Sequence, residues 1–381
     1  TATATPLVQQ DIAEQLGMAT GRRFIRGFRR SNLAVEVVEA PPSARRTMVA
    51  RLLADARRRP ALVYAPTRKE TEGLAAELGS TISAAAYHAG LNASVRSRVQ
   101  ASFLAGDLEV VVATIAFGMG VDKPDIRTVI HTGLPGTLES FYQEIGRAGR
   151  DGKRARAILL YSWADRHTHE FFLKRDYPDP TTLEAIFEAL GAEPQPRERV
   201  QRSLAMDDGV FLPALEKLWI HGGALVDPEE RACRGRAGWR KPYVEQRRHR
   251  HAQLEQMVRF AASRGCRMQS LVDHFGDTDD SAGDCGICDH CAPAACEARR
   301  FRKATRDELS TAEDVLSALR ERDGQTTGQL FRELVGSPAS ARNGFERVLD
   351  ALVRSALVES RPDSFVKDGR TIRFQRAWLT P

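Results

Sequence analysis

The sequence predicts an α/β domain built on a parallel sheet, followed by a cysteine-rich helical module and smaller α+β domains. Three observations carry this prediction. Between residues 60 and 161, short apolar runs alternate with helical patterns. Apolar strands joined by helical crossovers are typical of a parallel sheet that is covered on both faces. After Tyr177 the pattern changes to short helices and polar turns, and four of the six cysteines lie from Cys266 to Cys291.

The expected strands of the sheet end at small or turn-forming residues. Four strands are predicted, at 61–65, 110–114, 128–132 and 157–161, and another strand is expected to end at Tyr87. The helices between them are expected to begin at the N-cap residues Thr67, Ser94 and Ser140, because a hydroxyl group can accept a hydrogen bond from the first helical turn. Ligands of such sheets gather in the loops that follow the carboxyl ends of the strands.

Two later segments share the order of elements of a winged helix, in which three helices precede a two-stranded wing. The first has three short helices and a strand in residues 183–226, with the Gly-rich residues 235–242 as its expected wing. A long polar helix is then expected from about Tyr243 to Arg264. The second segment has helices near 311–322, 326–335 and 340–355, followed by two strands around 364–374.

The balance of charge favours a polyanionic partner. The net charge is +6 and the isoelectric point is about 9.1, and ten Lys and Arg residues from Arg231 to Arg264 face only Glu245 and Glu255. Such a run can neutralise nucleic-acid phosphates, although most basic runs are solvated surface. No apolar stretch approaches the length of a membrane span and no signal-peptide pattern is present, so we expect a cytoplasmic protein without a membrane partner.

The strongest local signal is the string QEIGRAGRDG from Gln143 to Gly152. Arg147 and Arg150 are three residues apart at the end of an expected helix that glycines interrupt, so both guanidinium groups can point in one direction. Phosphoryl transfer uses such groups against the charge on a γ-phosphate. A solvated basic turn would be the simpler interpretation if this string stood alone.

Two further strings follow expected strands upstream. Residues 113–124, ATIAFGMGVDKP, contain two glycines that allow backbone amides to approach a phosphate, and Asp122, which could accept from a ribose hydroxyl. Residues 87–91, YHAGL, contain His88. A hydrogen-bonded structural role is the commoner one for such a histidine, and a place near nucleic acid is the alternative.

The cysteine cluster has the spacing of a tetrahedral metal site. Cys285, Cys288 and Cys291 are separated by two residues each, and Cys266 stands at the end of the preceding helix. In a reducing compartment this clustering favours a metal over disulfides, and Zn²⁺ is the natural occupant of a four-sulfur site. Buried structural cysteines are the alternative. The other two cysteines, Cys233 and Cys296, are expected to be reduced thiols that bind no metal. His274 and His290 are possible substitute ligands.

In this order and spacing, the strings resemble the superfamily 2 helicase motifs in the form used by RecQ-type DNA helicases. Residues 143–152 resemble motif VI, residues 113–124 motif V and residues 61–66 motif IV. Residues 1–17 resemble the tail of motif III, and FRRSNL at 28–33 resembles the FxRPNL segment with Ser in place of Pro. The family pattern CR…FG…CGxCDxC matches Cys266-Arg267, Phe275-Gly276 and Cys285–Cys291.

The resemblance implies a domain for each part of the chain. Residues 1–178 would be the second RecA-like helicase domain, residues 244–298 a helical hairpin with the zinc-binding module, and residues 299–381 a winged-helix domain. The segment 179–243 has no counterpart in the family and is expected to form a winged-helix-like insertion, which changes how DNA would dock.

The resemblance also implies roles for single residues. Gln143, Arg147 and Arg150 would be catalytic, with the two arginines acting as arginine fingers on ATP bound to the other motor domain. The residues expected at ATP are Gly120, Asp122, Arg147 and Arg150. The residues expected at nucleic acid are His88, Gly90, Thr114, Gly118 and Met119. The implied metal ligands are Cys266, Cys285, Cys288 and Cys291.

The expected partners are ATP and Mg²⁺, bound mainly by a first motor domain, and single-stranded and duplex or forked DNA. The string GxxxxGK[ST] does not occur in the 381 residues. We therefore expect the first motor domain to precede Thr1 and this chain alone to hydrolyse no ATP. The resemblance implies a 3′→5′ DNA helicase of repair and recombination at the bacterial nucleoid. Whether a single-stranded-DNA-binding protein is a partner does not follow from the sequence.

Two other classes of protein compete with this interpretation. A zinc-containing winged-helix DNA-binding regulator without a motor would account for residues 180–381 but leaves motifs IV to VI unexplained. An RNA helicase or chromatin-type translocase shares motif VI, but the zinc cluster and the residues of motif V argue against this class.

Overall fold

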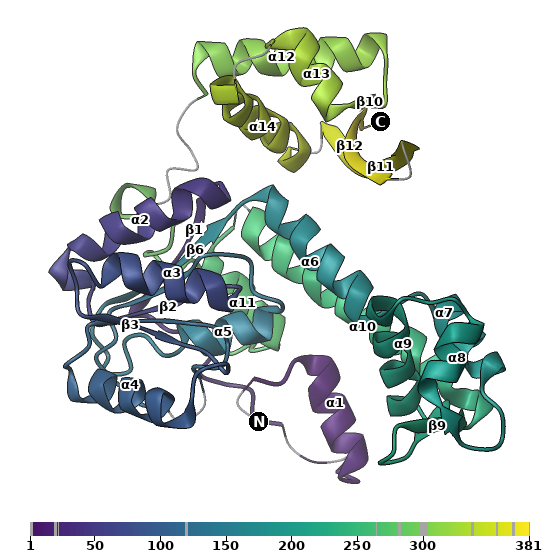
Figure 1. The fold of residues 1–381 in the computed structure, drawn as a ribbon. Coiled ribbons are helices and arrows are strands. Elements are labelled where there is room, and N and C mark those ends of the chain that lie inside the picture. The colour runs from purple at the N-terminus through teal and green to yellow at the C-terminus, as the bar shows by residue number, and fades with distance from the viewer. Residues whose placement is uncertain are drawn as a thin grey trace. The chain divides into compact units, whose positions relative to one another are not determined.

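The computed structural model of this chain describes residues 3–18, 21, 23–118, 121–263, 265–280, 283–297, 304–336, 339–355, 357–367 and 370–380. The chain divides into two compact units, Thr1–Arg300 and Phe301–Pro381 (Figure 1). Within the described residues, no helix has both the length and the apolar character needed to cross a bilayer.

Six parallel strands form the sheet of the first unit, in the order β1-β6-β5-β2-β4-β3. Their bounds are β1 Leu33–Glu39, β2 Ala61–Tyr64, β3 Ala84–Tyr87, β4 Val110–Ala113, β5 Thr128–His131 and β6 Ala155–Tyr161. The four strands predicted from apolar runs are β2, β4, β5 and β6, and β3 ends at Tyr87 as expected. The predicted parallel sheet is therefore confirmed.

The sequence pattern does not predict the edge strand β1, because Glu36 stands inside its apolar run. Glu36 is fully buried, pairs with Arg156 of β6 and accepts a hydrogen bond from the backbone N–H of Glu297. Burial raises the pKa of Glu36 above its ordinary value, although Arg156 acts in the opposite direction. A buried carboxylate whose hydrogen bonds are satisfied is compatible with a sheet interior.

Helices cover both faces of the sheet (Figure 1). On one face, α2 (Pro42–Ala54) and α3 (Arg68–Leu78) bury their apolar side chains. On the other face lie α4 (Ala93–Ala105) and α5 (Leu138–Ile145), together with two helices that come much later in the chain, α10 (Arg240–Ala262) and α11 (Arg267–Phe275). The cysteine-rich module and the sheet domain therefore share one hydrophobic core.

The expected helix starts are right at one position and wrong at two. Thr67 caps α3, and its hydroxyl accepts from the N–H of Glu70. Ser94 does not open α4, because Asn92 is the N-cap residue. Ser140 does not open α5 either, because the Thr137 hydroxyl accepts from the N–H of Ser140 at 3.1 Å. The helix thus begins one turn earlier than the Ser pattern suggests.

The segment between the sheet domain and the cysteines has a core of its own. Its elements are α7 Pro180–Ala189, β7 Gln195–Pro196, α8 Arg197–Ser203, α9 Asp208–Ile220, β8 Ala224–Val226 and β9 Arg231–Arg234, with sheet order β7-β9-β8. It joins the sheet domain through α6 (Trp163–Asp176), which lies beside α10 (Figure 1). Three helices and a small sheet are the elements expected of a winged-helix-like insertion.

The expectation that residues 235–242 form a wing is wrong. The turn between β8 and β9 lies at residues 227–230, where the N–H of Glu230 donates to the carbonyl of Asp227. Gly235 instead packs against the backbone that leads into β8. A Cβ at this position would lie 2.3 Å from the carbonyl oxygen of Gly222. The long polar helix α10 already begins at Arg240, before the predicted start at Tyr243.

The second unit has the element order predicted for a winged helix. Its elements are α12 Arg306–Glu321, β10 Gln325–Thr326, α13 Thr327–Leu334, α14 Ala339–Arg354, β11 Val358–Lys367 and β12 Arg370–Leu379, with sheet order β10-β12-β11. The helices and the hairpin enclose a separate core that includes Val315, Leu330 and Phe345. The order agrees with a winged helix, and that assignment stays a prediction.

Candidate functional site

The carboxyl ends of the parallel strands meet at one edge of the sheet, where ligands of such folds bind. Motif V follows β4, and motif VI lies in α5 and the turn after it. Arg150 and Asp122, one from each motif, form an ion pair with 2.6 Å between Nη1 and Oδ1. Arg150 also donates to the carbonyl of Val121 at 3.3 Å. Folding therefore brings motifs V and VI into direct contact.

The second arginine of motif VI is more enclosed. Arg147 is half-buried, and a Cβ on Gly118 of motif V would lie 2.9 Å from its Nη2 atom. Tyr64, the last residue of β2, donates its hydroxyl proton to the carbonyl of Phe117 at 3.0 Å. Burial raises the pKa of Tyr64 well above its usual value, against the opposing charge of Arg147. A side chain at Gly118 would therefore displace the Arg147 guanidinium group from its present position.

The remaining catalytic candidate, Gln143, is exposed and donates from Nε2 to the hydroxyl of Thr3 at 2.6 Å. This contact joins motif VI to the segment that resembles motif III. Met119 and Gly120, expected at nucleic acid and at ATP, lie outside the described residues.

The nucleic-acid candidates differ in exposure. His88 is 3% exposed, and its Nε2 lies 2.9 Å from Glu72 Oε1, which favours the structural role over direct nucleic-acid contact. Gly90 is exposed, and a Cβ there would lie 2.9 Å from Nη1 of Arg68. Thr114 is half-buried and its N–H donates to the carbonyl of Tyr87. Arg68, at the start of α3, was not singled out from the sequence, because an isolated arginine carries no signal.

The four predicted metal ligands converge. The Sγ atoms of Cys266, Cys285, Cys288 and Cys291 all lie within 4.8 Å of one another, and no other described group forms such a cluster. Tetrahedral zinc with Zn–S bonds of about 2.3 Å places sulfur atoms about 3.8 Å apart, and the Cys285–Cys291 and Cys288–Cys291 sulfur distances are 3.9 and 3.4 Å. The donor set therefore fits a structural Zn²⁺.

Within the cluster the thiol pKa values shift in opposite directions, because hydrogen bonds between the thiols raise the pKa of Cys285 and burial raises that of Cys291. Hydrogen bonds from Cys266 and Cys285 hold the pKa of the Cys288 thiol far below its usual value. Cys266 caps α11, and its Sγ accepts from the N–H groups of Gln269 and Cys285 at 3.5 and 3.2 Å. His274 is not a ligand, because its Nε2 bonds Glu139 of α5 at 2.9 Å.

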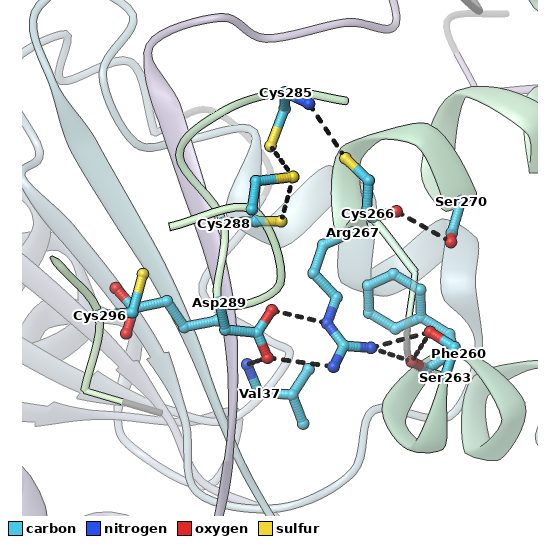
Figure 2. Close-up of polar contacts among 12 residues, drawn as sticks. Val37, Phe260, Ser263, Cys266, Arg267, Ser270, Cys285, Cys288, Asp289 and Cys296 are labelled. Atoms are coloured by element: carbon cyan, nitrogen blue, oxygen red, sulfur yellow. Dashed lines mark hydrogen bonds and ion pairs between the residues drawn. The ribbon is translucent and has the colours of Figure 1, made fainter. Parts of the chain in front are cut away.

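Two residues beside the ligands attach the zinc loop to the sheet (Figure 2). Arg267 and Asp289 form a bidentate ion pair at 2.8 and 3.0 Å, and each side chain is 1% exposed. The same Asp289 carboxylate accepts from the N–H of Val37 on the edge strand β1 at 3.3 Å. Both residues are letters of the CR…CGxCDxC pattern, but their spacing shows neither that they pair nor that they touch β1.

Comparisons with known proteins agree with this geometry. Residues 44–152, which include four of the six strands and the turn after α5, match the helicase conserved C-terminal domain. Residues 232–292 match the RecQ zinc-binding family. The chain accordingly carries the C-terminal helicase domain and zinc-binding module of a RecQ-type helicase of superfamily 2.

Individual relatives fall in the same group. The chain is 33% identical over 295 residues to the probable ATP-dependent DNA helicase RecS of Bacillus subtilis (strain 168), covering 76% of this chain and 58% of that protein. It is 42% identical over 166 residues to the RecQ-like DNA helicase blm-1 of Caenorhabditis elegans, covering 43% and 17%. The ATP-dependent DNA helicase RecQ of Bacillus subtilis (strain 168) is 40% identical over 176 residues, covering 46% and 29%. The chain thus spans less than two thirds of these relatives.

Proposed function

We propose that this chain supplies the second motor domain, the zinc module and DNA-binding surfaces of an ATP-dependent 3′→5′ DNA helicase. The observation that carries the proposal is the pairing of Arg150 with Asp122 beside Arg147, at the ligand-binding edge of the sheet. In this proposal both arginines are donors to the γ-phosphate of an ATP that, with Mg²⁺, is held mainly by a phosphate-loop domain. The proposal assigns Gln143 and Asp122 to the same nucleotide, and the sequence assigns Gly120 to it as well.

Asp122 is a suitable partner for Arg150 while no ATP is being hydrolysed, because the ion pair between them is weak. The Asp122 side chain is 83% exposed and that of Arg150 is 37% exposed, and exposed ion pairs contribute only about 0–1 kcal/mol. An arginine finger contributes about 10³ to 10⁵ in rate, which corresponds to about 4–7 kcal/mol. Transfer of Arg150 from Asp122 to a developing phosphate charge is therefore favourable.

The role proposed for the remaining parts is DNA binding and stability. Gly90, Thr114 and Gly118 border the strand ends that the proposal places beside DNA phosphates, and the winged helix of the second unit adds a duplex contact. In the insertion, α9 exposes the apolar side chains of Leu212, Trp219 and Ile220. The four cysteines would hold a zinc ion, which would close the loop that carries Asp289, the residue that contacts β1.

The test compares DNA-stimulated phosphate release by this chain, by the complete gene product, and by the gene product with Arg150→Ala. We expect no turnover from this chain, turnover from the complete product, and a loss of about 10³-fold or more in the variant. DNA binding by the variant, measured at two salt concentrations, should stay close to that of the unaltered protein. Robust turnover by this chain alone, or an undiminished rate in the variant, would contradict the proposal.

The same assay separates the proposed function from an RNA helicase. Single-stranded DNA should stimulate phosphate release more than RNA of the same sequence, and unwinding should proceed from a 3′ overhang. The wider assignment to repair and recombination at the bacterial nucleoid rests on the family alone.

A further inference from the structure

A short segment, residues 28–32, here called the strap, connects the zinc module to the motif VI turn, residues 146–149. It corresponds to the FRRSN part of the string singled out in the sequence, for which the proposed function assigns no task. Its first two residues contact the zinc module, and two of the later residues contact the turn from Gly146 to Gly149. The strap therefore lies between the two features that define this family.

The first end of the strap is fixed to the zinc module. The Phe28 ring stacks on Phe275 of α11, with 4.5 Å between centroids and 13° between planes. The N–H of Phe28 donates to the buried carboxylate of Asp277 at 3.3 Å. Arg29 donates to Gln269 of α11 and to two backbone carbonyls of the segment that leads to Cys285. Phe28 and Arg29 thus attach the first end of the strap to α11 and to the segment that leads to Cys285.

The second end of the strap binds the backbone of the motif VI turn. Arg30 donates to the carbonyl oxygens of Ala148 and Gly149 at 3.0 and 2.9 Å, and to that of Gly146 at 3.4 Å. Asn32 donates from Nδ2 to Gly149 at 2.7 Å and to a second carbonyl four residues later at 2.8 Å. Two side chains therefore satisfy most of the carbonyl groups of one short turn.

This arrangement has a clear physical basis. The last carbonyl groups of a helix have no partner within it, and they carry the negative end of the helix dipole. Arg30 offers several donors in a rigid plane, so one side chain can bind the end of α5 and the turn that follows. Gly149 has φ +62°, and a Cβ there would lie 2.6 Å from Asn32 Nδ2, so the close approach requires glycine.

We infer that Arg30 and Asn32 are positioning residues, which hold the backbone of the motif VI turn so that Arg147 and Arg150 keep their places. The statement about the turn stands on these contacts, and its consequence for ATP turnover rests on the proposed function. A misplacement of about 1 Å at a reacting group can cost about 10²-fold in rate. Loss of the Arg30 contacts should therefore lower kcat without a matching change in the KM for ATP.

The primary experiment measures amide hydrogen exchange in this chain, loaded with zinc, for residues 146–152. Arg30→Ala and, separately, Asn32→Ala should speed exchange in that turn about tenfold or more, with unchanged zinc content and unchanged exchange in β2 and β4. Arg26→Ala is the matched control, because Arg26 pairs with Asp279 in the zinc module with 73% of its side chain exposed. Unchanged exchange of the turn in the folded Asn32 variant overturns the inference even if Arg30→Ala does not fold.

A kinetic experiment on the complete gene product tests the consequence. Arg30→Ala should lower the kcat of DNA-stimulated ATP hydrolysis about 10²-fold with little change in KM, and Arg30→Lys should restore only part of it, because an ammonium group cannot reach all three carbonyls. An unchanged kcat in Arg30→Ala overturns the positioning role. An inactive unaltered protein would instead contradict the proposed function, and the exchange result on this chain would still decide the role of the strap.

Discussion

Removal of one partner of the buried Arg267–Asp289 pair should weaken the attachment of the zinc module to the sheet. In Asp289→Ala, the Arg267 guanidinium keeps its bonds to the carbonyl of Phe260 and the hydroxyl of Ser263 at 2.6 and 2.9 Å. It loses both bonds to a carboxylate, and no water can replace them readily because the side chain is 1% exposed. The N–H of Val37 also loses its acceptor.

The magnitude follows from burial. Breaking a buried ion pair by removing one partner costs about 3–5 kcal/mol, and an unsatisfied buried backbone N–H costs about 1–3 kcal/mol. These costs overlap, so we expect about 4 kcal/mol or more for Asp289→Ala. In the double variant Arg267→Met and Asp289→Leu the stranded charge is absent, so the cost should fall to about that of the Val37 N–H.

The assay is zinc release as a function of urea concentration, which reports on the zinc site directly in a chain with several cores. The order of stability should be unaltered protein, then the double variant, then Asp289→Ala. The control is Asp279→Ala, which removes an aspartate of the same module from a pair whose side chains are 73% and 58% exposed, and should cost less than about 1 kcal/mol. Equal midpoints for Asp289→Ala and Asp279→Ala would refute this reasoning.

Two further predictions concern zinc and pH. Elemental analysis of metal-replete protein should find one zinc per chain and much less in Cys288→Ser, whose zinc module should lose its hydrogen-exchange protection; full zinc occupancy in the variant would contradict the ligand set. Burial by itself would raise the pKa of Glu139, but hydrogen bonds, foremost that from His274, lower it to about 2. The stability advantage over Glu139→Gln should therefore be complete above about pH 4.5 and decline as the pH falls towards 2; an advantage in urea unfolding that does not change between pH 7 and pH 3 would count against this pair.

The sequence by itself determined the features that depend on neighbours along the chain. Apolar runs identified four strands of the sheet, and cysteine spacing identified the complete ligand set, because three of the four thiols lie in one short loop. Motif VI could be recognised from the sequence because Arg147 and Arg150 lie only three residues apart. Helix starts were predicted less well: Ser94 and Ser140 have the right chemistry but lie inside the first turn, and Asn92 and Thr137 occupy the N-cap positions.

Only the tertiary structure decided which distant residues became partners. Asp289 contacts Val37 across 252 positions, and Asn32 contacts Gly149 across 117. In the sequence Glu36 argues against a buried strand. In the folded chain Arg156 of the neighbouring strand supplies its counter-charge. Local patterns carry no information about such pairs, because a buried polar group is stable only when folding brings its partner within hydrogen-bond distance. The contacts of Arg30 and Asp289 are therefore present only in the folded chain.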